Sequence, residues 1–159
     1  RIASDLPDAK VIILLRDPIT RAYSHWNHID SKRPSWASDY HDVSFIDIVK
    51  TGGNNLVSRS KYLANLTAWV TAIGSDKVYV ALQESIETNP LEEYNKICTF
   101  LEVDPFEDTQ SFHKIFAGDY SSSILSSTKD YLKPIFASDV KGVKDLYPHL
   151  DYSLWNDYS

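Results

Sequence analysis

The sequence predicts an α/β fold in which helices flank a parallel sheet. Two short apolar runs rich in β-branched residues, KVIILL at 10–15 and KVYVAL at 77–82, have the composition of buried strands. Patterns of helical spacing separate and follow them, and the order strand, helix, helix, strand, helix is typical of a parallel sheet. A length of 159 residues with 13% aromatic side chains suits one packed domain.

The first strand leads directly into a helix. Residues 10–15 form a continuous apolar run, which predicts a strand buried on both faces. Asp17 and Pro18 come next, in the order preferred for an N-cap and the first helical position. The apolar residues that follow recur at helical spacing: Ile19, Ala22, Tyr23, Trp26 and Ile29.

The middle of the chain predicts a loop and two helices. Residues 31–42 are polar and contain Pro34, which predicts a loop. Residues 44–50 predict a short helix that ends at Gly52 and Gly53. Residues 60–73 predict a longer amphipathic helix with Gly74 just past its end.

Two further helices are expected after the second strand. Asn89 and Pro90 have the residue types of an N-cap and a first helical position, and two glutamates follow where the helix dipole favours negative charge. A last helix is expected from about Thr128. Pro134 lies one turn inside that pattern, so this helix either starts later or kinks there.

Composition excludes several classes of protein. A net charge of −6 argues against a general nucleic-acid binder. Residues 11–15 are the longest strongly apolar run, whereas a membrane-spanning helix needs about 20 residues. Cys98 is the single cysteine, which excludes a disulfide framework. The five histidines show no spacing typical of metal ligands.

One segment is basic within this acidic chain. Between residues 10 and 33 there are five basic residues, Lys10, Arg16, Arg21, Lys32 and Arg33, against two acidic ones, Asp17 and Asp30. This local excess of three positive charges indicates a possible site for a small anion. A solvated helix face of mixed charge is the alternative interpretation.

Arg16 and Ser24 are the leading candidates for binding such an anion. Arg16 ends the first strand, and ligands of open α/β sheets gather at the carboxyl ends of strands. Ser24 comes eight residues later, about two turns into the helix. A guanidinium fork and a hydroxyl could therefore converge on one phosphate. The alternative is that Arg16 pairs with a structural carboxylate.

The string RDPITRAYSHW at 16–26 resembles the motif by which sulfotransferases hold the 3′-phosphate of 3′-phosphoadenosine-5′-phosphosulfate. Later segments resemble consecutive elements of the heparan sulfate and other carbohydrate sulfotransferases and their bacterial relatives. These segments are SFIDIVKTGG, SRSKYLANLTAW, KVYVALQESIETNPLEEYNKICTFLEV and the terminal DYSLW. The resemblance covers nearly the whole chain.

This resemblance implies a parallel sheet like that of P-loop kinases, with residues 1–159 as a single domain from the C-terminal portion of the family fold. It implies transfer of a sulfuryl group from the phosphosulfate donor to a hydroxyl or amine of a carbohydrate or small molecule. The product adenosine 3′,5′-bisphosphate then leaves, and no metal is needed. The alternative hypothesis is a non-catalytic nucleotide-binding or interaction module of the same fold.

The resemblance also implies roles for individual residues. Arg16 and Ser24 would bind the 3′-phosphate, and Arg59 occupies a position near the adenine or the phosphates. A surface position beside a helix cap is the alternative for Arg59. His28, together with Asn27, would lie near the acceptor, although a histidine in the middle of such a helix is more often structural or solvent-exposed.

Several family features are expected elsewhere or are altered here. The Gly-rich loop that binds the 5′-phosphosulfate and the catalytic base are expected upstream of Arg1, so we expect this segment alone to be inactive. The family's late basic loop corresponds to HKIFAGDYSSS, where Lys114, Gly118 and the serines could serve. We expect a cytoplasmic location, with the Golgi lumen as the alternative for an anchored chain. The sequence does not indicate an oligomeric state.

Overall fold

Two parallel strands form the centre of the molecule. The computed structural model describes residues 2–32, 44–52, 55–107 and 123–158. Strand β1 (Val11–Leu15) pairs in parallel with β2 (Val78–Leu82), in a register that runs from Val11 opposite Val78 to Leu15 opposite Leu82. The two carboxyl ends therefore lie at the same edge of the sheet, and Arg16 and Gln83 follow them side by side. The predicted α/β class with a parallel sheet is confirmed.

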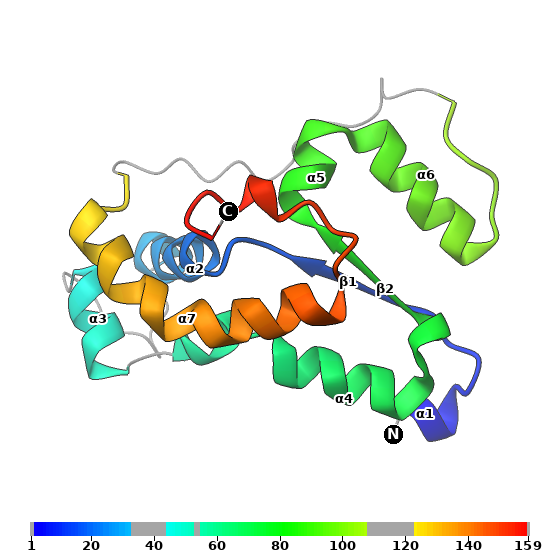
Figure 1. Cartoon of the computed structure of the whole chain (residues 1–159), viewed down its shortest axis with the longest axis horizontal. Helices are drawn as coiled ribbons and strands as arrows, with labels where there is room; N and C mark the ends of the chain where they lie inside the picture. Colours follow the sequence, from blue (N-terminus) through cyan, green and yellow to red (C-terminus); the bar gives the residue numbers. More distant parts are fainter. Residues whose placement is uncertain (1, 33–43, 53–54, 108–122, 159) are drawn as a thin grey trace.

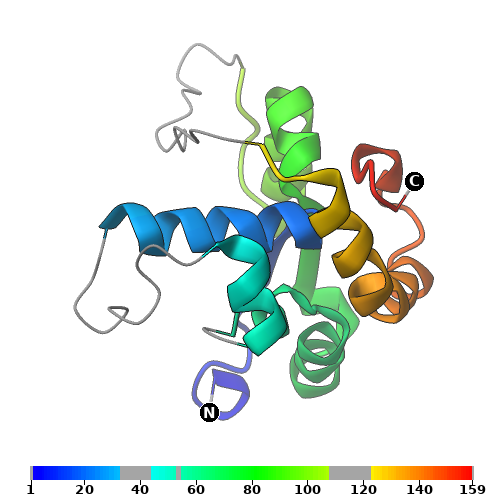
Figure 2. The same ribbon diagram turned by 90° about the vertical axis from the view of Figure 1, so that its left-hand side faces the viewer.

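Helices cover the strands on both sides (Figure 1). Helices α4 (Leu63–Ile73) and α7 (Ser126–Leu146) lie on one side. Helices α5 (Gln83–Thr88) and α6 (Pro90–Leu101) lie on the other, and Figure 2 shows the same separation after a quarter turn. Because α4 and α6 both contact β2, this strand has helices against both of its faces.

Burial differs between the two strands. Residues of β2 are buried or half-buried throughout. In β1, by contrast, Ile12 and Leu14 remain 38% and 57% exposed. The prediction that residues 10–15 are buried on both faces is therefore wrong for β1. Leu15 on one face of β1 is buried in the core. On the other face, the described elements leave the side chains of Ile12 and Leu14 partly exposed.

The turn after β1 follows the predicted pattern. Helix α2 spans Pro18–Lys32, and the Asp17 carboxylate caps it by accepting the N–H of Thr20 at 2.7 Å. This confirms the predicted N-cap and first helical position. Most of the predicted loop at 31–42 lies outside the described residues, and Ser31 and Lys32 belong to α2.

Helices α3 and α4 have clear local boundaries. Helix α3 (Phe45–Thr51) begins after the N-cap Ser44 and ends at Gly52, whose φ of 72° places it in the left-handed region that glycine adopts readily. Helix α4 begins at Leu63, three residues later than predicted, after the 3₁₀ turn η3 (Ser58–Ser60). The reason is tertiary: Asp139 of α7 accepts the N–H groups of Tyr62 and Leu63 at 2.7 and 3.2 Å, which caps α4 from another helix.

The chain beyond β2 contains one unexpected helix. The short α5 follows β2 at once, although the sequence pattern predicted only the helix after it. Helix α6 begins at Pro90 as predicted, with both glutamates in its first turn. Asn89 is its N-cap residue, as predicted, although the Asn89 side chain makes no capping hydrogen bond.

Helix α7 carries much of the core on its inner face. It begins at Ser126, two residues before the predicted start, and it continues through Pro134, which is exposed to solvent. Its buried residues pack with Trp155, which is fully buried at the end of the 3₁₀ turn η5 (Tyr152–Leu154). Two short elements complete the fold: helix α1 (Ile2–Asp5) and the 3₁₀ turn η4 (Ser75–Lys77). In the part of the chain that the structure describes, no helix has the length and apolar character needed to cross a membrane.

Candidate anion-binding site

A cavity of about 390 Å³ lies at the carboxyl end of β1. We call it the cationic cavity, and it is lined by Leu14, Arg16, Arg21, Ser24, His25, His28, Tyr62 and Gln83. It therefore brings together Arg16, Ser24 and His28, which the sequence singled out. Its position agrees with the general rule that ligands of open α/β sheets bind beyond the carboxyl ends of the strands.

The lining of this cavity has two guanidinium groups, two imidazoles and no carboxylate. Within the described residues, the Arg16 guanidinium forms no ion pair. The structural carboxylate that the alternative interpretation of Arg16 requires is thus not found there. Partly buried cations without counter-ions are unfavourable by themselves and favour the binding of an anion.

Arg21 adds a second cation to the cavity, and its hydrogen-bond partner among the described residues is a neutral group. Its Nη1 atom donates to the Ser60 hydroxyl oxygen at 3.3 Å, and that hydroxyl donates to the Leu56 carbonyl at 2.9 Å. Burial lowers the pKa of Arg21, and the nearby positive charge of Arg59 lowers this pKa further. Arg21 remains a cation at neutral pH, since arginine is deprotonated only far above it.

The pKa of His25 is lowered by burial and by the positive charges around the cavity. Burial lowers its pKa, and the neighbouring charges of Arg21, Arg59 and His28 lower this pKa further. Its Nδ1 atom is buried without a hydrogen-bond partner among the described residues. A buried nitrogen without a partner is unusual in a folded protein, and a bound ligand would explain it.

The remaining predicted residues have different positions. Arg59 is near enough to affect the pKa values of Arg21 and His25, but it does not line the cavity. Asn27 also lies outside the lining, and its amide donates to the Tyr23 carbonyl one turn earlier in α2 at 3.0 Å. Its role near an acceptor stays a prediction. Lys114 and Gly118 of the predicted closing loop lie outside the described residues.

Four lining residues with polar side chains were missed from sequence: Arg21, His25, Tyr62 and Gln83. A signal existed for the first two, because Arg21, Ser24, His25 and His28 recur at spacings of three, one and three residues. Such spacing puts side chains on one face of a helix. Tyr62 and Gln83 had no such signal, since they come from other segments of the chain.

A second cavity of about 230 Å³ shares Arg16 and Gln83 with the first. We call it the acidic cavity, because its lining includes Asp17, Glu84, Glu87 and Asp157. Asp157 is paired with two lysines, Lys129 and Lys133, at 3.0 and 3.2 Å. Glu84 instead accepts the N–H groups of Asp17 and Trp155. No group of three or more His, Cys, Asp or Glu residues suited to a metal ion occurs in the described ranges.

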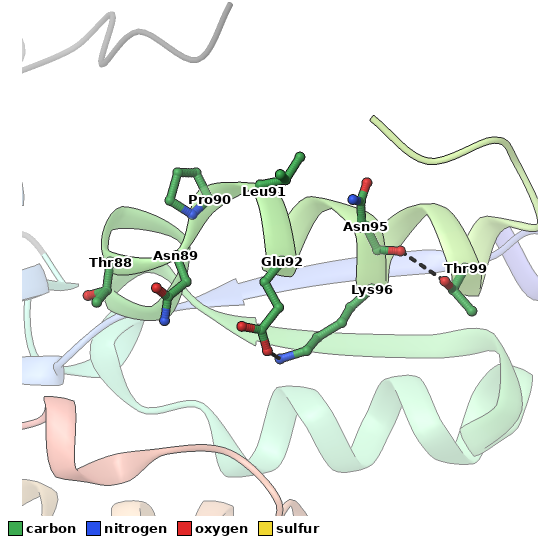
Figure 3. A pocket seen from close by; sticks show the side chains of 8 residues that line it. All are labelled: Thr88, Asn89, Pro90, Leu91, Glu92, Asn95, Lys96 and Thr99. Atoms are coloured by element: carbon green, nitrogen blue, oxygen red, sulfur yellow. Dashed lines mark hydrogen bonds and ion pairs between the residues drawn. The ribbon is translucent and has the colours of Figure 1, made fainter. Parts of the chain in front are cut away.

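A third cavity, of about 710 Å³, lies along α5 and α6 (Figure 3). Its only cation, Lys96, contacts the carboxylates of Glu92 and Glu93 at 2.8 and 2.7 Å. The Thr99 hydroxyl donates to the Asn95 carbonyl at 2.9 Å. Lys96 is thus paired within α6, so the lining of this cavity lacks the cations without ion pairs that are found at the end of β1.

A comparison with protein families identifies the family of this chain. A family model described as the sulfotransferase family matches residues 1–108, which is more than half of the chain. The chain therefore belongs to the sulfotransferase family. The matched range contains β1, α2, β2 and every residue that lines the cationic cavity.

Individual relatives give the same result. The chain is 26% identical over 113 residues to the bifunctional heparan sulfate N-deacetylase/N-sulfotransferase of Drosophila melanogaster. It is 27% identical over 116 residues to the human bifunctional heparan sulfate N-deacetylase/N-sulfotransferase 2. These matches cover 65% and 67% of the chain but only 10% and 13% of the relatives.

A solved structure extends the similarity to the whole fold. The crystal structure of a sulfotransferase from Alicyclobacillus acidocaldarius matches with a TM-score of 0.71 and 25% sequence identity. The match covers 98% of this chain and 60% of that chain. The chain thus corresponds to somewhat over half of a sulfotransferase that has been solved.

Proposed function

We propose that the cationic cavity binds the 3′-phosphate of 3′-phosphoadenosine-5′-phosphosulfate. The chain would then contribute this half of the donor site to an enzyme that transfers a sulfuryl group to a hydroxyl or amine of a carbohydrate or small molecule. One observation carries the proposal: Arg16, Arg21 and Ser24 line a cavity that has no carboxylate.

The chemistry of these groups suits a phosphate. A guanidinium offers a planar fork of N–H donors, and a hydroxyl adds a further donor. Charge-assisted hydrogen bonds of this kind are roughly twice as strong as neutral ones. A volume of about 390 Å³ is within the range of small-molecule sites. We assign donor binding to these residues, and we assign no described residue as the base that deprotonates the acceptor.

The test is calorimetric titration of adenosine 3′,5′-bisphosphate into the intact protein and its Arg16→Ala variant. We expect the variant to bind about 10- to 100-fold more weakly, the range for a lost hydrogen bond to a charged group. Lys141→Ala is the matched control, because it removes a positive charge that is exposed on α7 and paired with Asp145. Adenosine 5′-monophosphate, which lacks the 3′-phosphate, should bind weakly to all three proteins.

Two results would contradict the proposal. One is the absence of binding by the folded wild-type protein, and the other is equal affinity of wild type and Arg16→Ala. A transfer assay with the phosphosulfate donor and amine- or hydroxyl-bearing carbohydrates then separates the enzyme from the alternative module. Binding of the bisphosphate without transfer to any acceptor would favour a nucleotide-binding module.

A further inference from the structure

The peptide unit between Arg16 and Asp17 is held by side chains from two distant segments. The Tyr62 hydroxyl donates to the Arg16 carbonyl oxygen at 2.9 Å. The Asp17 N–H donates to Glu84 Oε1 at 2.8 Å. Both polar groups of one peptide unit are thus satisfied by side chains, where backbone groups or water are the usual partners.

This peptide unit lies where the sheet no longer determines the backbone direction. The strand pairing ends at Leu15 opposite Leu82, so Arg16 is the first residue beyond the ladder. The orientation of the Arg16 side chain depends on the backbone dihedral angles at Arg16. Because the carbonyl of Arg16 and the N–H of Asp17 belong to the same rigid plane, bonds to both fix the rotation of that plane.

Tyr62 and Glu84, the two residues that hold this peptide unit, are themselves bonded to residues from the last third of the chain. Glu84 uses its second oxygen, Oε2, to accept the indole N–H of Trp155 at 3.2 Å. The Tyr62 N–H donates to the Asp139 carboxylate at 2.7 Å, and the rings of Tyr62 and Trp155 have centroids 6.3 Å apart. Asp139 of α7 and Trp155 after η5 therefore help to fix the positions of Tyr62 and Glu84.

Within the described residues, neither Tyr62 nor Glu84 forms an ion pair that would compete with these hydrogen bonds. Both carboxylate oxygens of Glu84 accept N–H groups, and the Glu84 carboxylate forms no ion pair within the described residues. Burial raises the pKa of Tyr62 well above its ordinary value, so its hydroxyl stays a neutral donor at physiological pH. Tyr62 also lines the cationic cavity, whereas Glu84 lines only the acidic one.

We propose that Tyr62 and Glu84 are positioning residues that direct the Arg16 guanidinium into the cationic cavity. Through them the C-terminal residues Asp139 and Trp155 influence the affinity of the donor site. The inference rests on the proposed function, because it concerns how well Arg16 binds the 3′-phosphate.

The test measures the affinity for adenosine 3′,5′-bisphosphate and the melting temperature of each variant of the intact protein. Tyr62→Phe removes only the hydroxyl that binds the Arg16 carbonyl. Glu84→Gln keeps the shape of the side chain but leaves one acceptor oxygen for two N–H groups. We expect each variant to bind the bisphosphate about 5- to 10-fold more weakly, the effect of roughly one hydrogen bond.

A double-mutant cycle distinguishes positioning from direct contact. In an Arg16→Ala background, with titrations extended to millimolar ligand, Tyr62→Phe and Glu84→Gln should change the affinity by less than about twofold, because the residue they orient is absent. An undiminished effect in that background would contradict action through Arg16.

Tyr152→Phe is the matched control for the loss of a tyrosine hydroxyl. The Tyr152 hydroxyl also donates to backbone carbonyls, those of Tyr147 at 3.1 Å and Val143 at 3.3 Å, and it does not line either cavity at Arg16. We expect Tyr152→Phe to lower the melting temperature and leave the affinity unchanged. A merely structural role for Tyr62 would produce that same pattern and would overturn the inference.

The outcomes also separate this inference from the proposed function. If wild type and Arg16→Ala bind the bisphosphate equally, or neither binds, the proposed function fails and the inference fails with it. If Arg16→Ala weakens binding but Tyr62→Phe and Glu84→Gln match wild type, only the positioning inference fails. Should Glu84→Gln not fold, Tyr62→Phe carries the test, because its change is a single buried hydroxyl.

Discussion

The cationic and acidic cavities share Arg16 and Gln83 but use their charged groups in opposite ways. In the acidic cavity, Glu84 accepts two N–H groups and Asp157 contacts two lysines. In the cationic cavity, Arg16 forms no ion pair with any described residue, and His25 Nδ1 has no partner among them. Glu84 and Asp157 on the acidic side are thus partnered within the fold, whereas the cationic side has donors left for a ligand.

This difference shows how neighbouring residues divide between stability and function. Arg16 and Asp17 are adjacent in the chain, yet the Asp17 carboxylate caps α2 while the Arg16 side chain lines a cavity without carboxylates. Burial raises the pKa of Asp17, whose Oδ2 atom has no partner among the described residues. Substitutions on the acidic side should therefore change the free energy of unfolding, and substitutions on the cationic side should change binding.

The largest effect is expected when the cationic cavity is given a carboxylate. Ser24→Asp removes a hydroxyl donor and adds a negative charge next to the bound phosphate. The repulsion between two charges about 4 Å apart is roughly 4 kcal/mol at an effective dielectric constant of 20, so affinity for adenosine 3′,5′-bisphosphate should fall about 1,000-fold in calorimetry. Ser75→Asp is the control, because Ser75 is exposed in η4 at the opposite end of β2. A Ser24→Asp variant that still binds with the affinity of wild type would contradict anion binding in the cationic cavity.

The next effect concerns the acidic side. Glu84→Ala leaves the Asp17 N–H and the Trp155 indole N–H without their shared acceptor. Each buried donor without a partner costs ~1–3 kcal/mol, so we expect the free energy of unfolding to fall by about 2–4 kcal/mol in urea denaturation. Glu87→Gln, which changes an exposed carboxylate of the same cavity, should change it by less than about 0.5 kcal/mol. Equal stability of Glu84→Ala and wild type would show that the acidic side is not structural.

A smaller effect is expected from the pH dependence of His25. Its pKa is lower in the folded chain than the ordinary value of 6.5, so the unfolded chain binds the proton more readily. The His25 contribution to stability is therefore complete above pH 6.5 and is lost progressively as the pH falls below that value.

In melting curves between pH 7.5 and 5.5, His25→Gln should lose less stability than wild type. Saturating adenosine 3′,5′-bisphosphate should oppose the loss, because the phosphate stabilises the imidazolium. Parallel curves for the two proteins would contradict a lowered pKa of His25 in the folded chain.

The smallest effect on stability is expected for Arg16→Ala. Because the Arg16 guanidinium has no ion pair within the described residues, its removal should change the free energy of unfolding by less than about 0.5 kcal/mol. Denaturation of the variant beside wild type measures this. A decrease of several kcal/mol in the free energy of unfolding would show that Arg16 stabilises the fold. The two cavities would then not differ in the way described above.

Local signals in the sequence predicted the framework of the site. The apolar run before Arg16, the N-cap Asp17 and the helical spacing after Pro18 each act within a few residues, and β1, α2 and the position of Ser24 follow from them. The start of α4 was predicted too early, and a distant contact is the reason. Helix α4 starts later than predicted because Asp139 caps it, 77 residues away from Tyr62 in the chain.

Residue types and their spacing were enough to predict a strand that ends just before Arg16 and a capped helix that carries Ser24 two turns further on. These features depend on residue types and spacing, which are visible in one short segment. The groups that surround Arg16, by contrast, follow from the packing of distant segments. Tyr62 and Glu84 reach its peptide unit from 46 and 67 residues away. Such contacts have no period in the sequence, because they form only when strand pairing and helix packing bring the segments together.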